Sequence, residues 1–178
     1  MRTHGAWAVT LWLAGLAACG GPGPVEEGGP GPAAGEPGAA LQQQQTGQVT
    51  AEGVTYTAET RIAETAPVTM YTTVRVENTS SGRQEVTFPD GCVVLLRAYR
   101  GPARMGAPAW DQERGVACTM QLVELSLAPG ESREFQTSVR ADRILGDSLP
   151  AGRYYFTAVL RPDGRVVEVP AGEADLAK

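Results

Sequence analysis

Several stretches of the chain alternate apolar and polar residues with a period of two. In residues 68–77, and again in 122–127 and 134–140, every second residue is apolar or a threonine. Alternate residues of an extended chain point to opposite faces, so these stretches predict β-strands with one buried face. The continuous apolar run 93–96 predicts a central strand, and the aromatic and branched residues of 154–160 predict a late one.

Turn-forming residues separate the predicted strands. They are the runs NTSSG at 78–82, PDG at 89–91, APG at 128–130 and PDG at 162–164. Short strands punctuated in this way predict an all-β fold, a β-sandwich or a small barrel, in residues 48–178. The one helical candidate is a turn at 141–145, and the stretch 120–125 fits a strand or a helix equally well.

The N-terminus has the features of an export signal. An apolar run at 6–18 follows Arg2, and as a helix it would span only about 20 Å, too short for a bilayer. The run ends in LAAC at 16–19, which resembles the lipobox of bacterial lipoproteins. The resemblance implies cleavage after residue 18 and a lipid on the Cys19 thiol. The alternative, an ordinary secretory signal, needs an A-x-A-like site that 14–19 does not supply.

A linker is expected between the lipid anchor and the folded domain. In residues 20–38, 13 of 19 residues are Gly or Pro, and a glutamine run follows. Such a stretch cannot bury enough apolar area to offset its ordering entropy. We therefore predict a signal peptide at 1–18, a lipid-anchored disordered tether at 19–47 and a domain at 48–178. The protein would be exported and anchored to the bacterial cell membrane or outer membrane.

Two scarce residue types limit the chemistry of the chain. The only histidine is His4, inside the predicted signal peptide, and the only lysine is Lys178. This excludes Ser–His–Asp and Cys–His groups, histidine-ligated zinc and a phosphate-loop lysine, and no cofactor or metal is expected. Removing residues 1–18 leaves 14 basic and 20 acidic residues, a net charge of −6, which argues against nucleic acid as a partner.

Two cysteines remain in the predicted domain, Cys92 and Cys118. In an exported protein such a pair indicates a disulfide. Closing the loop would stabilise the fold by roughly 3.5 kcal/mol, because it lowers the chain entropy of the unfolded state. The alternatives are a redox pair, which usually has C-x-x-C spacing, and two buried free thiols. A disulfide would restrain the loop 100–115.

The sequence LPAGRY at 149–154 leads into the late strand. It resembles the tyrosine corner of immunoglobulin-like sandwiches, in which a tyrosine hydroxyl bonds back to the preceding loop. The resemblance implies a structural role for Tyr154.

Several segments together resemble the intracellular proteinase inhibitor (BsuPI) family. They are 74–80 (VRVENTS), 86–91 (VTFPDG), Trp110, 125–132 (LSLAPGES) and 150–158 (PAGRYYFTA). The resemblance covers roughly residues 54–160 and implies an immunoglobulin-like antiparallel β-sandwich of about 7–9 strands. The departures are Cys92, where a polar residue is expected, Val94-Leu95, where an aromatic-acidic pair is expected, and the export signal of this chain.

The first functional hypothesis is a non-enzymatic protein-binding module at the cell envelope. Its candidate surface is the loop 99–111, which contains Arg100, Arg104, Met105 and Trp110, residue types enriched at interfaces. The alternative for Trp110 is a place in the core. The expected partners are a membrane, through the lipid on Cys19, and a protein of the envelope.

The second hypothesis, implied by the family resemblance, is a proteinase inhibitor. Such an inhibitor needs a rigid extended loop, and Arg104-Met105 lies near the apex of 100–115, although three glycines loosen that loop. The third is a carboxylate-based hydrolase. The alternative is that the acidic residues simply form a solvated surface. These residues are Glu77, Asp90, Asp111, Glu113, Glu124 and Glu131.

Overall fold

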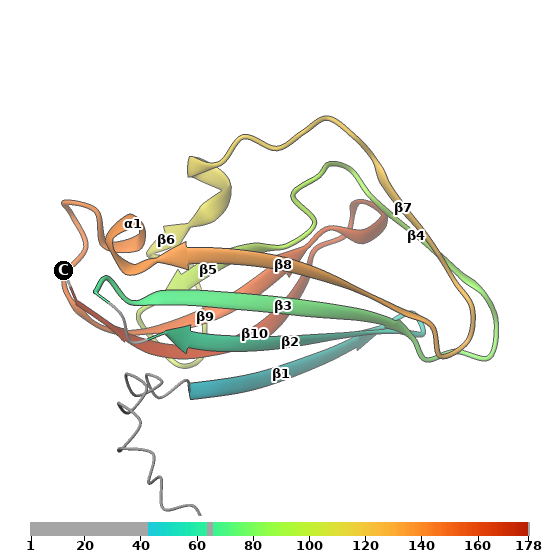
Figure 1. Ribbon diagram of the computed structural model, residues 1–178, viewed down its shortest axis with the longest axis horizontal. Helices are drawn as coiled ribbons and strands as arrows, with labels where there is room; N and C mark the ends of the chain where they lie inside the picture. The colour runs from blue at the N-terminus through green and yellow to red at the C-terminus, as the bar shows by residue number, and fades with distance from the viewer. Residues whose placement is uncertain (1–42, 64–65, 178) are drawn as a thin grey trace, which may run out of the picture. The chain divides into compact units, whose positions relative to one another are not determined.

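The computed structural model describes residues 43–63 and 66–177, and most of this part of the chain is antiparallel β-strand (Figure 1). The strands are β1 (Gln43–Ala51), β2 (Val54–Ala63), β3 (Thr69–Asn78), β4 (Gln84–Phe88), β5 (Leu95–Tyr99), β6 (Trp110–Asp111), β7 (Val123–Leu127), β8 (Ser132–Arg140), β9 (Gly152–Leu160) and β10 (Val167–Leu176). The helices are η1 (Gln112–Gly115), α1 (Ala141–Leu145) and η2 (Pro162–Gly164). The predicted signal peptide, Cys19 and nearly all of the predicted tether lie outside the described residues.

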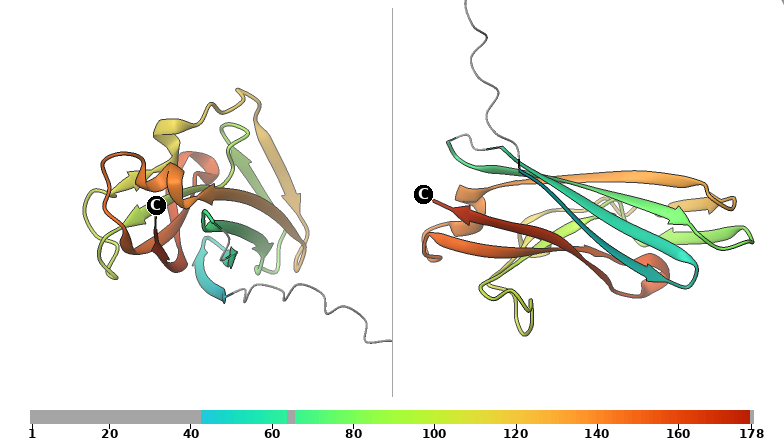
Figure 2. Two further views of the ribbon diagram at one scale, coloured as in Figure 1. Left: turned by 60° about the vertical axis from the view of Figure 1, so that its left-hand side comes forward. Right: turned by 90° about the horizontal axis from the view of Figure 1, so that it is seen from below.

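The strands form two four-stranded sheets and a two-stranded ribbon (Figures 1 and 2). One sheet has the order β1-β2-β3-β8, the other β10-β9-β5-β6, and β4 pairs with β7 in the ribbon. Buried side chains from both sheets and from the ribbon form one apolar cluster, so the sheets pack as a sandwich. The prediction of an antiparallel all-β sandwich is confirmed, with ten strands in the described residues where about 7–9 were expected.

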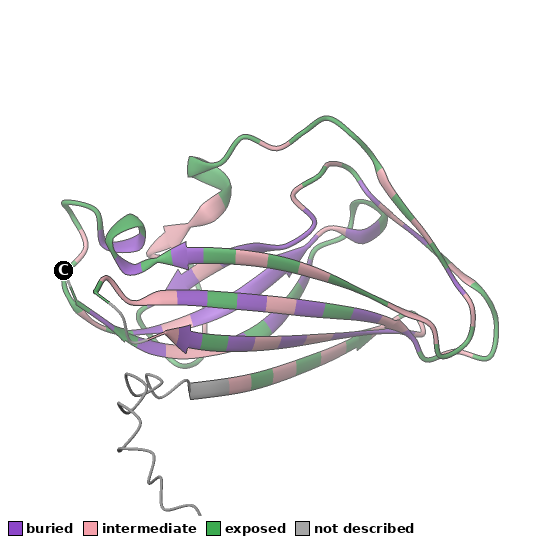
Figure 3. Ribbon diagram, in the orientation of Figure 1, coloured by how far each residue is buried: buried purple, intermediate pink, exposed green. Residues whose placement is uncertain are grey.

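The alternation of apolar and polar residues correctly predicted which face of the strand is buried. In β3, Met70, Thr72 and Val74 are buried, while Tyr71 and Arg75 on the other face of the strand are exposed. The banding of buried and exposed residues along the strands is visible in Figure 3. The predicted central strand is β5, which lies between β9 and β6, although it begins at the third residue of the apolar run. The predicted helical turn is α1, which ends at Leu145 and is capped by Gly146.

The first strand begins inside the stretch 19–47 that was expected to be a tether. β1 starts at Gln43, five residues before the expected boundary at residue 48, and pairs along its length with β2. The Gln45 amide also bridges to β10, donating to the carbonyl of Glu173 and accepting from its N–H at 2.8 and 2.6 Å. A glutamine run can therefore form a strand here because backbone ladder bonds do not require apolar side chains.

The end of β3 is fixed by one buried amide. The Asn78 side chain is fully buried and donates to the carbonyls of Gly82 and Leu127 at 2.7 and 2.8 Å. Its oxygen accepts from the N–H and the hydroxyl of Ser80. Because all these bonds are satisfied, the residue joins the β3–β4 turn to β7 at little desolvation cost.

Among the described residues, no helix is long and apolar enough to cross a membrane.

Candidate functional site

Cys92 and Cys118 form a disulfide, with their Cα atoms 5.4 Å apart. The prediction of a disulfide is confirmed. The bond joins the segment after β4 to the irregular segment between η1 and β7. Asp90 lies beside the two sulfurs, and the possible ligand atoms of these three residues have the spacing of a metal site. The bonded sulfurs are not thiolates, however, and the Asp90 carboxylate already accepts from the N–H of Cys92 at 2.8 Å.

Tyr154 makes the predicted tyrosine corner. Its buried side chain donates from the hydroxyl to the carbonyl of Pro150 at 2.7 Å. The Arg100 guanidinium lies 4.6 Å above the centre of the same ring, within the range of a cation–π contact. These contacts are those of a tyrosine with a structural role, and Arg100 covers the ring from the segment that directly follows β5.

The β5–β6 loop, residues 100–109, is held on the second sheet by Arg104. The guanidinium donates to the carbonyls of Phe156 and Gly172 at 3.0 and 3.1 Å, and to Pro102 at 3.2 Å. The sequence analysis predicted that Arg104 belongs to an interaction surface, but its bonds are internal to the domain. Arg104 therefore fixes its own loop.

At the tip of that loop, Met105 is 81% exposed. Its neighbours Arg104 and Gly106 both have positive φ angles, 53° and 78°. The apex is therefore kinked on either side of Met105, not extended as a substrate-like inhibitor requires. A role for this loop in binding a partner stays a prediction.

The sequence left two alternatives for Trp110, a residue of the interaction surface or a residue of the core, and its burial lies between them. It belongs to β6, is half-buried and packs against the core cluster. One side of it lines a groove of about 460 Å³ with Val116, Val139 and Arg143 among its walls. Most of its apolar area therefore stabilises the domain, and only part faces solvent.

The disulfide-bound segment, residues 116–122, was not singled out as a site from the sequence. It crosses above the rest of the domain in Figure 1, between η1 and β7, and is mostly exposed in Figure 3. Met120 is 96% exposed and Leu122 57% exposed, and Val116 is exposed as well. The sequence signal was a weak one: three apolar residues around a cysteine, in a stretch whose periodicity was ambiguous.

The backbone of this segment is held from one side. The N–H of Gly91 donates to the carbonyl of Thr119 at 3.1 Å, next to the disulfide. A Cβ at position 91 would lie only 2.2 Å from the Thr119 hydroxyl, so the close approach depends on glycine. Tethering through backbone and disulfide leaves the side chain of Met120 free of contacts that would hide it.

A network of ion pairs fixes η1, which leads into the segment. Arg97 binds Asp111 at 2.9 Å and Glu168 at 2.8 Å, and Arg161 makes two bonds of 2.5 Å to the carboxylate of Glu113. The hydrogen bonds from Arg161 hold the pKa of Glu113 below its ordinary value. Asp111 also caps η1 through the N–H of Glu113.

The acidic residues considered for a hydrolase are mostly engaged in such contacts. Glu77 pairs with Arg75 and Glu131 with Arg133, while Asp111 and Glu113 belong to the network of Arg97 and Arg161.

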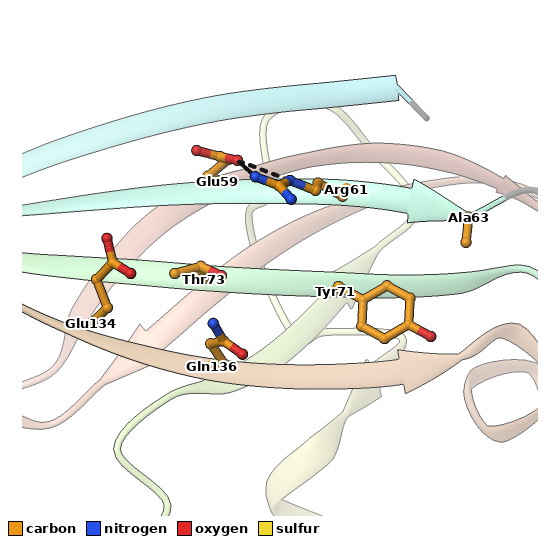
Figure 4. A pocket seen from close by; sticks show the side chains of 7 residues that line it. All are labelled: Glu59, Arg61, Ala63, Tyr71, Thr73, Glu134 and Gln136. Atoms are coloured by element: carbon orange, nitrogen blue, oxygen red, sulfur yellow. Dashed lines mark hydrogen bonds and ion pairs between the residues drawn. The ribbon is translucent and has the colours of Figure 1, made fainter. Parts of the chain in front are cut away.

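A hollow of about 410 Å³ on the outer face of the first sheet has two further carboxylates, from Glu59 and Glu134 (Figure 4). Glu59 is paired with Arg61 at 3.0 Å. Figure 4 shows Glu134 on β8, with β3 between it and Glu59. Two strand spacings of about 4.8 Å therefore separate the backbones that carry these two groups.

The sequence of the domain is similar to that of a known protein family. Residues 54–164 match the sequence profile of the BsuPI family, described as intracellular proteinase inhibitor. No curated protein is matched by the chain.

Among solved structures, two of a β-glucosidase from Kluyveromyces marxianus are similar, one selenomethionine-labelled and one in complex with glucose. Each is 16% identical and covers 66% of this chain, with TM-scores of 0.34 and 0.35. The chain spans 13% of the length of those enzymes. Likenesses this weak say nothing about what this chain binds.

Proposed function

This chain belongs to the BsuPI family of intracellular proteinase inhibitors, and from that premise we propose that its sandwich is a non-enzymatic binding domain whose partner is an endopeptidase. The observation that carries the proposal is the exposed, disulfide-bound segment 116–122, which lies within the part of the chain that matches the family. Inhibitors act by presenting a preorganised surface to the enzyme. A carboxylate hydrolase is not proposed, because most of the candidate carboxylates are bound to arginines or to backbone N–H groups.

We further propose that the protein acts at the cell envelope, exported and anchored by a lipid on Cys19. The lipobox at 16–19 is the basis for the anchor. The disulfide supports export, because disulfides persist in oxidising compartments and are rare in the cytosol. The target would then be an endopeptidase of the envelope, although the family is described as intracellular.

The inhibitory function is tested with the full chain and a panel of serine and metallo-endopeptidases. We expect at least one enzyme to lose activity at micromolar protein, with tighter inhibition by the oxidised than by the reduced form. An unaffected panel would contradict inhibition. Denatured protein is the control, because an unfolded chain is a competing substrate and not an inhibitor.

The anchor is tested separately, in cells that express the chain with Cys19 or with Cys19→Ala. Incorporation of labelled palmitate and recovery in the membrane fraction are expected for Cys19 only. Equal distribution of the two proteins between membrane and soluble fractions would contradict the anchor without affecting the inhibitory function.

A further inference from the structure

Resting on the proposed function, we propose that the disulfide-bound segment 116–122 enters the endopeptidase active-site cleft as a substrate would, with the Met120 side chain in the enzyme's primary specificity pocket. The target is therefore an endopeptidase whose pocket accepts a long, unbranched apolar side chain. The proposal differs from the sequence interpretation, which placed Arg104-Met105 of the β5–β6 loop at the apex of the inhibitory surface.

Exposure is the first argument. Met120 is 96% exposed, more than any other large apolar side chain of the described residues. A methionine this free of the domain loses little by moving into a pocket, and an apolar pocket gains its buried area. The thioether chain is slender and flexible, which suits a deep pocket.

Backbone conformation is the second argument. A cleft that binds substrates takes an extended chain, in which no residue has a positive φ. Val116 is extended, with φ −119° and ψ 147°. The positive φ angles of the described residues all lie outside 116–122, whereas Arg104 and Gly106 have them on either side of Met105. Of the two exposed loops that contain a methionine, only the disulfide-bound segment is therefore free of positive φ angles.

Preorganisation is the third argument. Cys118, two residues before Met120, is bonded to Cys92, and Thr119 accepts from the N–H of Gly91. Three residues after Met120, β7 begins and pairs with β4. The flexible span is thus short and held at both ends, which reduces the entropy lost on binding and retains both new ends if the bond after Met120 is cut.

Charge is the fourth argument. The segment has the sequence VACTMQL, and none of its side chains is charged. Burying it in a cleft therefore carries no charge-desolvation cost. The nearest acidic residues along the chain are Glu124, which is exposed in β7 four residues after Met120, and Glu113, which is paired with Arg161.

The experiment exchanges the specificity of the segment. The full chain, Met120→Arg, Met120→Glu and the matched control Met105→Arg are assayed against serine endopeptidases with a deep apolar pocket, an acidic pocket and a small pocket. We expect the unmodified chain to inhibit the enzyme with the apolar pocket. Met120→Glu should inhibit it roughly 30-fold or more weakly, and Met120→Arg should gain inhibition of the enzyme with the acidic pocket.

A gain of inhibition cannot come from a misfolded variant, so the arginine exchange keeps the test informative, and the unfolding midpoint of each variant checks the fold. If the unmodified chain inhibits but the Met120 variants behave like it, the inference is wrong and the proposed function stands. The same holds if the Met105 variant changes specificity instead. If the unmodified chain inhibits no enzyme of the panel, the proposed function and the inference fail together.

Discussion

The β5–β6 loop and the disulfide-bound segment are both exposed, and both have a methionine at the outermost point, but they are held in opposite ways. The first is fixed by a side chain: the Arg104 guanidinium binds three backbone carbonyls. The second is fixed by a disulfide and by the backbone bond from Gly91 to Thr119. The first loop has positive φ angles on either side of its methionine, whereas the second has none and leaves its methionine side chain exposed.

The comparison shows why residue type is a weak guide to a binding surface. Arginine is enriched at interfaces, yet Arg104 satisfies carbonyls of its own domain, and Arg100 covers Tyr154. The disulfide-bound segment contains no arginine or aromatic residue, but its apolar side chains lie in solvent. The two regions therefore differ in whether the side chains expected to bind a partner are already bound within the domain.

The largest expected effect is that of removing the disulfide. In the double variant Cys92→Ala, Cys118→Ala, the free energy of unfolding should fall by about 3 kcal/mol, because the denatured chain is no longer restrained. Denaturant unfolding measures the change. Amide hydrogen exchange should increase in residues 116–122 and remain unchanged in the β5–β6 loop. Equal increases in the two regions would show that they are not independently held.

The second effect is that of removing the side-chain tether. Arg104→Ala should cost about 2 kcal/mol, because charge-assisted bonds to partly buried carbonyls are lost. Met105→Ala, at the exposed neighbour, should stay within about 0.5 kcal/mol of the unmodified chain. Thermal unfolding of both variants measures this. A cost at Met105 as large as that at Arg104 would contradict the internal role of the arginine.

The third effect concerns the tyrosine corner, whose Tyr154 ring is covered by Arg100 of the β5–β6 loop. Tyr154→Phe removes the bond to the Pro150 carbonyl and should cost about 1 kcal/mol, with Tyr71→Phe, on the exposed face of β3, as the neutral control. Inhibition through the disulfide-bound segment should be unchanged. Weaker inhibition by Tyr154→Phe than by Tyr71→Phe would show that the corner also positions that segment.

The smallest effect is a dependence on pH at the entry to the disulfide-bound segment. Bonds from Arg161 lower the pKa of Glu113 in the folded state from its ordinary value of 4.5. This pair therefore contributes stability above pH 4.5, and the contribution is lost as the pH falls through the lowered value. Because the Glu113 side chain is 41% exposed, only a few tenths of a kcal/mol are expected. Glu113→Gln should flatten this part of the pH dependence of the unfolding midpoint, and an unchanged curve would contradict the assignment.

Most of the fold followed from local patterns in the sequence. The alternation in 68–77 predicted β3 and its buried face, because a period of two distinguishes the two faces of a strand whatever lies opposite. The cysteine pair predicted the disulfide, and LPAGRY predicted the tyrosine corner. The first residues of β1, 43–47, fell in the stretch expected to be a tether, because the glutamine run has no apolar face. They are held by pairing with β2 and by the amide bridge to β10.

The candidate site was likewise predictable only in part from the sequence. By itself, the sequence determined that Cys92 and Cys118 are available to pair, that a loop follows β5, and that the predicted domain has no histidine and a single lysine, its last residue. Only the tertiary structure decided that Arg104 binds inward and that Met120 lies free in solvent. Both outcomes depend on carbonyls and glycines distant in the chain, Phe156, Gly172 and Gly91, whose positions relative to the loops are set by packing of the sheets.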